Sequence, residues 1–382
     1  MDITTCCIHG SRKKYDSTGA ISVPIFQSAT FAHPGVEKST GFDYARQQNP
    51  TREHLEQTLC SLEEAADALA FSTGMAAVTA LMELFSPGDH IIASDDLYGG
   101  SHRLFEHISK KNGLTFSITD TTDLSCIELL ITDNTKALFI ESPSNPMMLV
   151  TDIAAAAAIC RAHHLLLIVD NTFLTPYLQK PLKFGADISL YSGTKYLAGH
   201  NDTLAGFLVV KNPELSQRLR FIYKTTGACL SPFDSWLTIR GMKTLAVRME
   251  RQQKTAMELA HWLTRQPYVT KVYYTGLASH PQWDISLRQT RGFGAMLSFQ
   301  VDTPETARRI LEGVQIIQYA ESLGGVESLI TYPMLQTHAD LPQKEREKKG
   351  ITDRLLRFSV GLEDPEDLKS DLIQAISGRD AK

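Results

Sequence analysis

The sequence of 382 residues lacks any long apolar run. Its longest apolar runs, Ile153–Cys160 and Leu165–Val169, fall far short of the roughly 20 apolar residues that a membrane-spanning helix requires. Residues 1–14, MDITTCCIHGSRKK, contain no apolar stretch of the kind that forms the centre of a secretion signal. We therefore expect a cytoplasmic protein with no membrane partner.

Cysteine and strings of basic residues are also scarce. The six cysteines are scattered at positions 6, 7, 60, 126, 160 and 229, with no Cys-x-x-Cys pair and no spacing typical of zinc ligands. We therefore expect free thiols in a reducing compartment, with neither a disulfide framework nor a metal site. The formal net charge is −5 and no basic stretch is present, so we expect no nucleic-acid partner.

Apolar residues make up 43% of the chain, enough for a large core. From Ala68 onward, strand-like runs alternate with helical segments. The expected strands are 68–73, 90–94, 136–142, 165–171, 188–193 and 206–210, and the expected helices include 49–65, 74–85 and 152–164. Such alternation predicts an α/β fold with a largely parallel sheet, in which ligands bind at the carboxyl ends of the strands.

The pattern changes near residue 236. Residues 240–266 read as one long amphipathic helix. After it come expected strands at 269–274, 295–300 and 355–360, and expected helices near 304–314 and 365–377. We therefore predict an N-terminal arm over residues 1–48, an α/β domain over 49–236 and a smaller α+β domain over 237–382.

One lysine stands in an unusual place. In SLYSGTKYLAGH, Ser189–His200, a buried-type strand stops at Gly193 and Lys195 follows, with no acidic residue before Asp202. Most lysines are solvated surface charges. A lysine at the carboxyl end of a buried strand can instead lose its proton through desolvation and attack a carbonyl carbon. Pyridoxal 5'-phosphate is the cofactor that requires such a lysine.

A pyridoxal phosphate site also needs a carboxylate for the ring nitrogen and donors for the phosphate. Asp170 ends the apolar run LLLIVDN, where it is either a strand-end cap or the partner of the ring nitrogen. In STGMAAV a strand meets a helix start at Gly74 or Met75, and free N–H groups there favour an anion, although many strand-to-helix turns look similar. Ser192 and Thr194 flank the lysine and offer two further donors.

Over essentially its whole length, the chain resembles the Cys/Met-metabolism pyridoxal-phosphate enzymes, the trans-sulfuration family. Eight motifs in family order carry the resemblance: GFDYARQQNPTR (41–52), FSTGMAA (71–77), DLYGGSHRLF (96–105), ESPSNP (141–146), VDNTF (169–173), YSGTKYLAGHND (191–202), ESLGGVESLI (321–330) and RFSVGLED (357–364). The resemblance is strongest to the branch of bacterial cystathionine γ-synthases and O-acetylhomoserine thiolyases, through STGFDY, PFDSWLTIRGMKTL and RLLRFSVGLE.

The resemblance implies an aspartate-aminotransferase-like fold of type I and a homotetramer, a dimer of dimers with shared active sites. It implies that Lys195 bonds to the cofactor and later moves protons, that Asp170 pairs with the ring nitrogen, and that Tyr98 stacks on the ring and acts as an acid or base. The implied phosphate contacts are Gly74, Met75, Ser192 and Thr194, with Tyr44 and Arg46 from a neighbouring subunit.

Substrate residues are implied in the same way. Asn145, Ser322 and Arg357 would hold the substrate, with Arg357 on its α-carboxylate. Asp43 and Glu321 would hold a distal amino group, and Arg103 a distal carboxylate. Taken singly, most of these residues have an ordinary explanation, such as a turn residue or a surface ion pair.

Members of this family catalyse γ-replacement, γ-elimination, β-elimination or direct sulfhydrylation. Methionine γ-lyases of this family resemble YGC where this chain has Gly99 and Gly100, and they carry a small apolar residue where it has Glu321. Both differences argue against methionine γ-lyase activity. We predict γ-replacement on an O-acylated homoserine with cysteine, a cystathionine γ-synthase reaction. Cystathionine γ-lyase or β-lyase activity is the alternative, and a non-catalytic scaffold is a third possibility, against which the set of Lys195, Asp170, Tyr98 and Arg357 argues.

Overall fold

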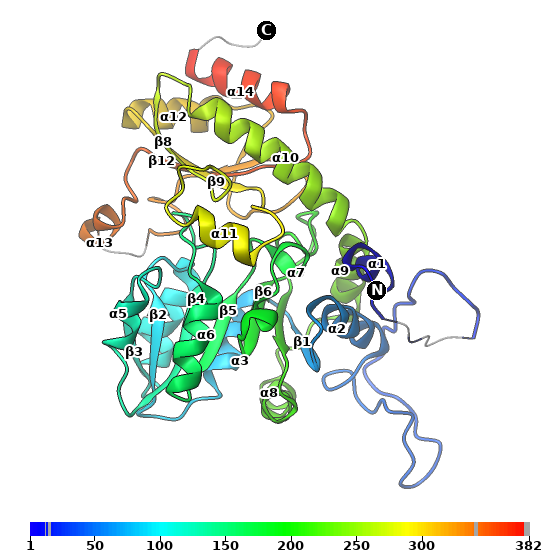
Figure 1. Ribbon diagram of the computed structural model, residues 1–382. Coiled ribbons are helices and arrows are strands. Elements are labelled where there is room, and N and C mark those ends of the chain that lie inside the picture. Colours follow the sequence, from blue (N-terminus) through cyan, green and yellow to red (C-terminus); the bar gives the residue numbers. More distant parts are fainter. Residues whose placement is uncertain (12, 14–16, 340–342, 378–382) are drawn as a thin grey trace.

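The computed structural model describes residues 1–11, 13, 17–339 and 343–377. The chain forms two sheets, a seven-stranded sheet from residues 67–210 and a five-stranded sheet from residues 269–359 (Figure 1). None of the helices in these described ranges combines the length and the apolar character needed to cross a membrane.

The larger sheet has the strand order β1-β7-β6-β5-β4-β2-β3. Its strands are β1 (Asp67–Phe71), β2 (His90–Ser94), β3 (Thr115–Thr119), β4 (Thr135–Glu141), β5 (Leu166–Asp170), β6 (Ile188–Ser192) and β7 (Gly206–Val210). Only β7 runs antiparallel to its neighbours. The predicted α/β fold with a mostly parallel sheet is therefore confirmed, although β3 was missed.

Helices cover both faces of this sheet because its strands are apolar on both sides. In β1, Leu69 and Phe71 face one core, which includes α3 (Gly74–Met82) and α8 (Pro213–Thr226). Ala68 and Ala70 face the other core, which includes α2 (Pro50–Glu63) and α6 (Ile153–Ala162). Fully buried parallel strands read as continuous apolar runs, which is why these strands were visible in the sequence.

The smaller sheet has the order β10-β11-β12-β9-β8. Its strands are β8 (Val269–Tyr273), β9 (Met296–Val301), β10 (Gln318–Tyr319), β11 (Leu329–Thr331) and β12 (Leu355–Ser359). Helices α12 (Pro304–Gly313) and α14 (Pro365–Ser377) lie together beside it, as Figure 1 shows at the top of the molecule. The remaining short helices are α4 (Gly99–Leu104), η1 (Phe105–Ser109), α5 (Leu124–Glu128), α7 (Thr175–Leu178), η2 (Pro181–Phe184), α11 (Trp283–Gln289) and α13 (Gln343–Lys348).

The prediction of one long helix over 240–266 is wrong. Two helices, α9 (Pro232–Met242) and α10 (Leu245–Leu263), meet at Thr244, whose backbone is not helical. Beyond this break, Arg248 of α10 is buried and donates hydrogen bonds to the carbonyl oxygens of Tyr196 (2.8 Å) and Gly241 (2.9 Å). Both helices are amphipathic, so the apolar pattern runs through the break and hides it in the sequence.

The first residues form a helix within the segment that the sequence predicts as an N-terminal arm, and the contact of that arm with a neighbouring subunit stays a prediction. Helix α1 (Ile3–His9) buries Ile3, Cys6 and Cys7 and packs on α2 and α10. The described residues from 17 to 48 contain no helix, and Figure 1 shows this blue segment extending away from the rest of the molecule. The division of the chain near residue 236 stays a prediction, and that residue lies inside α9.

Candidate active site

A pocket of about 210 Å³ lies where the carboxyl ends of the larger sheet's strands meet residues of the second half of the chain. The residues that line it come from segments far apart in the sequence. They are Thr73, Gly74, Met75, Val78, Tyr98, Ser101, Glu141, Asn145, Asp170, Thr172, Phe173, Leu190, Ser192, Thr194, Lys195, Leu204, Glu321, Ser322, Leu323, Thr337 and Arg357. The structure thus brings together eleven of the fifteen predicted site residues.

Lys195 follows β6 in a tight turn. The Nζ of Lys195 donates to Ser322 Oγ at 2.9 Å. The pKa of Lys195 is lowered to about 8, mainly by burial and also by the positive charge of Arg357, while the charge of Glu321 acts in the opposite direction. A lysine with such a pKa has roughly a tenth of its amine unprotonated at pH 7, far more than an exposed lysine. The amine can therefore act as a nucleophile and as a proton acceptor.

Two carboxyl groups end neighbouring strands at the floor of the pocket. Asp170 of β5 and Glu141 of β4 are directly paired across the sheet. Asp170 Oδ1 accepts from the backbone N–H (3.0 Å) and the hydroxyl (2.6 Å) of Thr172. Burial raises the pKa of Asp170 to about 6, so this carboxylate is still mainly ionised at neutral pH. An anion in this position can hold a protonated ring nitrogen.

The turn before α3 has the geometry of an anion site. Thr73 caps the helix by accepting from the N–H of Ala76 at 2.9 Å, so the first-turn N–H groups of Gly74 and Met75 have no partner within the helix. A methyl group at Gly74 would lie 3.2 Å from Ser192 Oγ, so this hydroxyl lies directly beside the turn. Backbone donors and a hydroxyl group converge here, as a phosphate requires.

Arg357 on β12 closes the other side of the pocket. Its Nη1 donates to Asn145 Oδ1 at 2.9 Å, and its Nη2 donates to the carbonyl oxygen of Ser322 and to Thr331 Oγ1, both at 3.1 Å. Its Nε is buried and has no hydrogen-bond partner among the described residues. Burial lowers the pKa of Arg357 to about 10, which leaves it a cation at neutral pH. A carboxylate ligand would satisfy this group.

Ser322 has an unusual backbone conformation, and Tyr98 is unusually exposed for an aromatic residue of the pocket. Ser322 has φ of +90°, a strained conformation for a residue with a side chain, and it directs a hydroxyl to Lys195 and a carbonyl to Arg357. Tyr98 precedes α4 and is 42% exposed, so its ring is free to face a ligand. A methyl group at Gly100 would overlap this ring, which explains the second glycine of LYGG.

These residues fit pyridoxal phosphate. The unpartnered N–H groups of α3, the anion at Asp170 and the partly unprotonated Lys195 match the phosphate, the ring nitrogen and the aldehyde carbon respectively. The orphaned Nε of Arg357 matches the carboxylate of an amino-acid substrate. Bound here, the cofactor would supply an electron sink that stabilises negative charge on the substrate's carbon atoms.

Four predicted site residues lie outside this pocket in the single chain. Asp43 is 3.4 Å from His33 and accepts from Ser39 at 2.8 Å. Arg46 donates to the carbonyl oxygen of Lys224, and its guanidinium lies 5.5 Å from the ring centroid of Tyr44. Arg103 is exposed on α4. Their roles stay predictions, because those assigned to Tyr44 and Arg46 involve a second subunit.

Some pocket residues were missed in the sequence. Glu141 and Thr172 lie inside recognised motifs, ESPSNP and VDNTF, but no role was assigned to them. The position of Glu141, at the end of an apolar strand like Asp170, is the signal that would have found it. Thr337 lies in a loop without regular structure, and no sequence pattern points to it.

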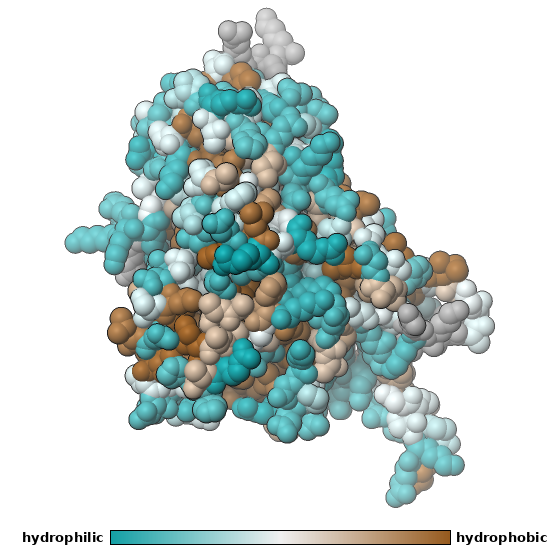
Figure 2. Space-filling view, viewed as in Figure 1, coloured by the Kyte–Doolittle hydropathy of each residue, from teal (hydrophilic) through white to brown (hydrophobic). Residues whose placement is uncertain are grey.

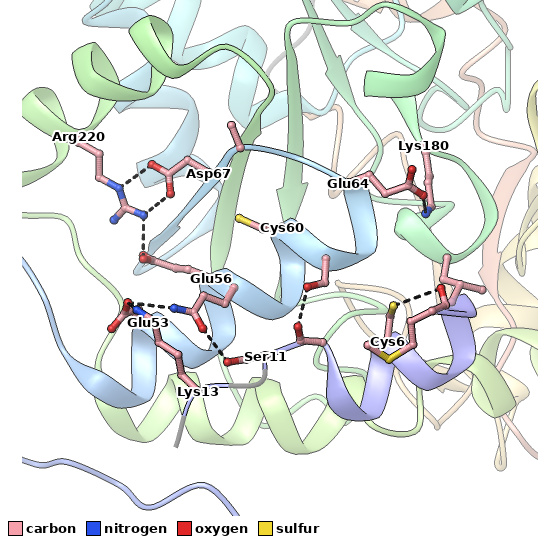
Figure 3. A pocket seen from close by; sticks show the side chains of 16 residues that line it. Cys6, Ser11, Lys13, Glu53, Glu56, Cys60, Glu64, Asp67, Lys180 and Arg220 are labelled. Carbon is pink, nitrogen blue, oxygen red and sulfur yellow. Dashed lines mark hydrogen bonds and ion pairs between the residues drawn. The ribbon is translucent and has the colours of Figure 1, made fainter. Parts of the chain in front are cut away.

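A larger cavity, of about 1090 Å³, lies elsewhere, between α1 and α2 (Figure 3). Its charged groups already satisfy one another. Arg220 pairs with Asp67 at 2.7 Å and with Glu56 at 2.9 Å, and Lys180 pairs with Glu64 at 2.9 Å. Burial raises the pKa of the Cys60 thiol to about 12, which makes it unreactive. The smaller pocket is therefore the candidate active site.

Fold and site together are those of an enzyme that works with pyridoxal phosphate. A family model described as "Cys/Met metabolism PLP-dependent enzyme" matches residues 4–377, and the chain belongs to this family. The resemblance seen in the sequence is thereby confirmed, and with it the cofactor.

Individual relatives are similar over nearly the whole chain. The cystathionine gamma-synthase of Haemophilus influenzae is 48% identical over 376 residues, 98% of each chain. The cystathionine gamma-synthase/O-acetylhomoserine (thiol)-lyase of Bacillus subtilis is 50% identical, covering 94% of this chain and 92% of the relative. The crystal structure of cystathionine gamma-lyase from Lactobacillus plantarum with L-serine has a TM-score of 0.96 at 43% identity and 99% coverage of both chains.

Proposed function

We propose that this protein is a cystathionine γ-synthase, which joins cysteine to an O-acylated homoserine and releases the acyl group as a carboxylic acid. The observation that carries the proposal is that Glu321 and Arg357 line one pocket, and that the charges of both act on Lys195. Arg357 suits the α-carboxylate common to all substrates. Glu321, exposed at the mouth, suits the ammonium of a second amino acid.

The remaining residues have roles that follow from their positions. Lys195 accepts the proton of the substrate's α-carbon, because its amine is partly unprotonated in the pocket. Loss of a γ-substituent requires removal of a second proton, from the β-carbon. The same amine can accept that proton only after it has passed on the first one, so it acts in turn as base, acid and base. Asp170 keeps the ring nitrogen protonated, and Tyr98 covers the ring and serves as a further acid or base.

Two relatives named as γ-synthases support γ-replacement, at 48% and 50% identity. Cleavage of cystathionine by γ- or β-elimination is the second candidate. It is favoured by the structural similarity to a γ-lyase, and by the fact that Glu321 would hold the distal ammonium of cystathionine equally well.

For the assembly we propose a homotetramer in the cytoplasm, a dimer of dimers with shared active sites. The segment from 17 to 48 extends from the molecule, and on it Ile21 is 96% and Val36 92% exposed. We infer that a second subunit covers this segment. In this arrangement Tyr44 and Arg46 contact the phosphate in the neighbouring subunit, and Asp43 and Arg103 contact the distal groups of the substrate.

The test is an assay of purified enzyme loaded with pyridoxal phosphate. O-Acetylhomoserine, O-succinylhomoserine and cystathionine are each supplied with and without cysteine, and with sulfide in place of cysteine. We expect cystathionine from at least one acylated homoserine only when cysteine is present. Cleavage of cystathionine with no synthesis from either ester would replace the proposal with a lyase.

A further inference from the structure

Glu141 is a buried acid that the proposed mechanism does not use. It ends β4, is 6% exposed, and is paired across the sheet with Asp170, so two carboxyl groups lie side by side on the pocket floor. Among the described residues neither of them forms an ion pair. Two adjacent carboxyl groups without an ion-pair partner cannot both be ionised at low cost.

The hydrogen bonds decide which of the two carries the charge. Asp170 accepts two hydrogen bonds, both from Thr172, and each of them stabilises an anion. Among the described residues, Glu141 accepts one hydrogen bond, from the backbone N–H of Tyr98 at 2.8 Å, and its carbonyl oxygen can accept that bond while the acid is neutral. The anion is therefore better supported at Asp170.

The charges around Glu141 point the same way. Asp170 on β5 and Asp96, in the loop before Tyr98, are both acids. The positive charge of Arg357 on β12 opposes them, as does that of Lys195 across the pocket, although Arg357 is already bound to Asn145 and Ser322. Burial first, and then the charge of Asp170, raise the pKa of Glu141 well above its usual value.

We propose that Glu141 is a positioning residue that keeps its proton at neutral pH, holds the backbone of Tyr98, and so confines the negative charge of the pocket floor to Asp170. Tyr98 is then aligned with the ring by a neutral group. The ring nitrogen meets one localised anion instead of a charge shared between two acids. This inference rests on the proposed function only through the roles of Asp170 and Tyr98, and not through the choice of substrate.

The first test compares two variants by the affinity of the apoenzyme for pyridoxal phosphate, measured by protein fluorescence without substrate. Glu141→Gln mimics the neutral acid and can still accept the Tyr98 N–H, so we expect a Kd within about threefold of the wild type. Glu141→Leu leaves that N–H unpaired, and we expect a loss of roughly five- to a hundredfold. If Gln weakens binding as much as Leu does, Glu141 acts as an anion and the proposal is wrong.

The second test uses the thermal stability of the apoenzyme as a function of pH, and it also decides the matter if the Leu variant does not fold. When the pKa of an acid is higher in the folded protein than in the unfolded chain, the protein loses stability as the pH rises above the pKa of the unfolded chain. Between the two pKa values only the unfolded chain releases the proton. Glutamine removes this loss. The Tm of Glu141→Gln relative to wild type should therefore increase from about pH 5 to about pH 8.

Glu312→Gln, on an exposed position of α12, is the matched control and should show no such trend. A pH-independent difference for Glu141→Gln would overturn the proposal. Both tests omit substrate, so failure of the γ-synthase assignment would leave their outcomes unchanged, and failure here would leave that assignment intact.

Discussion

Lys195 is the residue in which local chemistry and tertiary structure combine most directly. The motif SGTKY places an amine at the end of a buried strand, but the motif alone does not change its acidity. The pocket does so, because burial and the charge of Arg357, more than 160 residues away in the sequence, destabilise the ammonium ion. Ser322, which also comes from the second half of the chain, orients the amine.

Lys195→Ala should reduce turnover by about 10³-fold or more, because it removes both the covalent anchor of the cofactor and the main proton carrier. The fold should persist, since the backbone of Lys195 does not have the positive φ that would disfavour alanine. Turnover and far-ultraviolet circular dichroism check the two statements. Lys211→Ala, at an exposed position after β7, should leave both unchanged. Turnover near that of the wild type in Lys195→Ala would contradict the whole assignment of the site.

Glu321→Ala should lower kcat/KM for cysteine or cystathionine more than for a short substrate without a distal charge. Glu321 is exposed at the pocket mouth, so water weakens its ion pairs and we expect a difference of roughly three- to tenfold. Steady-state kinetics on both kinds of substrate measure it, and Glu321→Gln shows whether charge or size is responsible. Equal losses on both substrates would mean that Glu321 does not bind the distal group.

At the scale of elements, the site depends on how closely the start of α3 approaches the sheet. Gly206 begins β7, and a methyl group there would overlap the carbonyl oxygen of Thr73 and lie 2.7 Å from Gly74 Cα. Because Gly206 has no side chain, the turn at Thr73 and Gly74 packs directly on β7. There it lies beside Ser192, the residue paired with Gly206 across the sheet. The position of the helix is set by a neighbouring strand, and not by α3 itself.

Gly206→Ala should push the turn at Thr73 and Gly74 away from the sheet. Overpacking of this kind typically costs about 1–3 kcal/mol, so we expect a lower Tm of the apoenzyme and, in addition, weaker binding of pyridoxal phosphate. Gly35→Ala is the control, because a methyl group there meets only Lys38 Cδ at 3.5 Å. Unchanged cofactor affinity in Gly206→Ala would show that the turn does not bind the phosphate.

At the scale of the whole molecule, the backbone of the segment from 17 to 48 extends away from the body of its own chain (Figure 1), to which it is joined by hydrogen bonds such as those of Val23 with Trp236 and of Arg46 with Lys224. Exposed apolar residues are not confined to this segment. On the face shown in Figure 2, brown apolar residues also gather over the region of α5, β3 and α6. The extended segment differs because it carries predicted site residues, Tyr44 and Arg46, that do not reach the pocket of their own chain. In the proposed assembly, a second copy of the chain would bring these residues to the pocket of its neighbour.

Shared active sites predict complementation between inactive variants. When Lys195→Ala and Arg46→Ala proteins exchange subunits, half of the dimers are hybrids, and each hybrid has one site with both residues intact. About a quarter of the wild-type activity should therefore return, above the residual activity of Arg46→Ala alone. Two different affinity tags verify the exchange. Proven exchange without any recovery would mean that Arg46 serves its own chain.

Much of the larger sheet was predictable because its strands are buried on both faces and therefore read as uninterrupted apolar runs. β3 was missed because TFSIT is partly polar. The strand lies at the edge of the sheet and is only partly buried, so it does not need a continuous run of apolar residues. The break between α9 and α10 was missed because both helices keep the same apolar period. α1 was missed because a helix of seven residues shows too few turns for a pattern.

The sequence by itself determined the order of the elements, the family motifs and the identity of the chemical groups, because each of these is written in neighbouring residues. Only the tertiary structure decided which groups meet. It paired Glu141 with Asp170, bound Arg357 to Asn145 across 212 residues, and largely buried the amine of Lys195. Acidity depends on burial and on charges within a few ångströms, and these are set by contacts between distant segments.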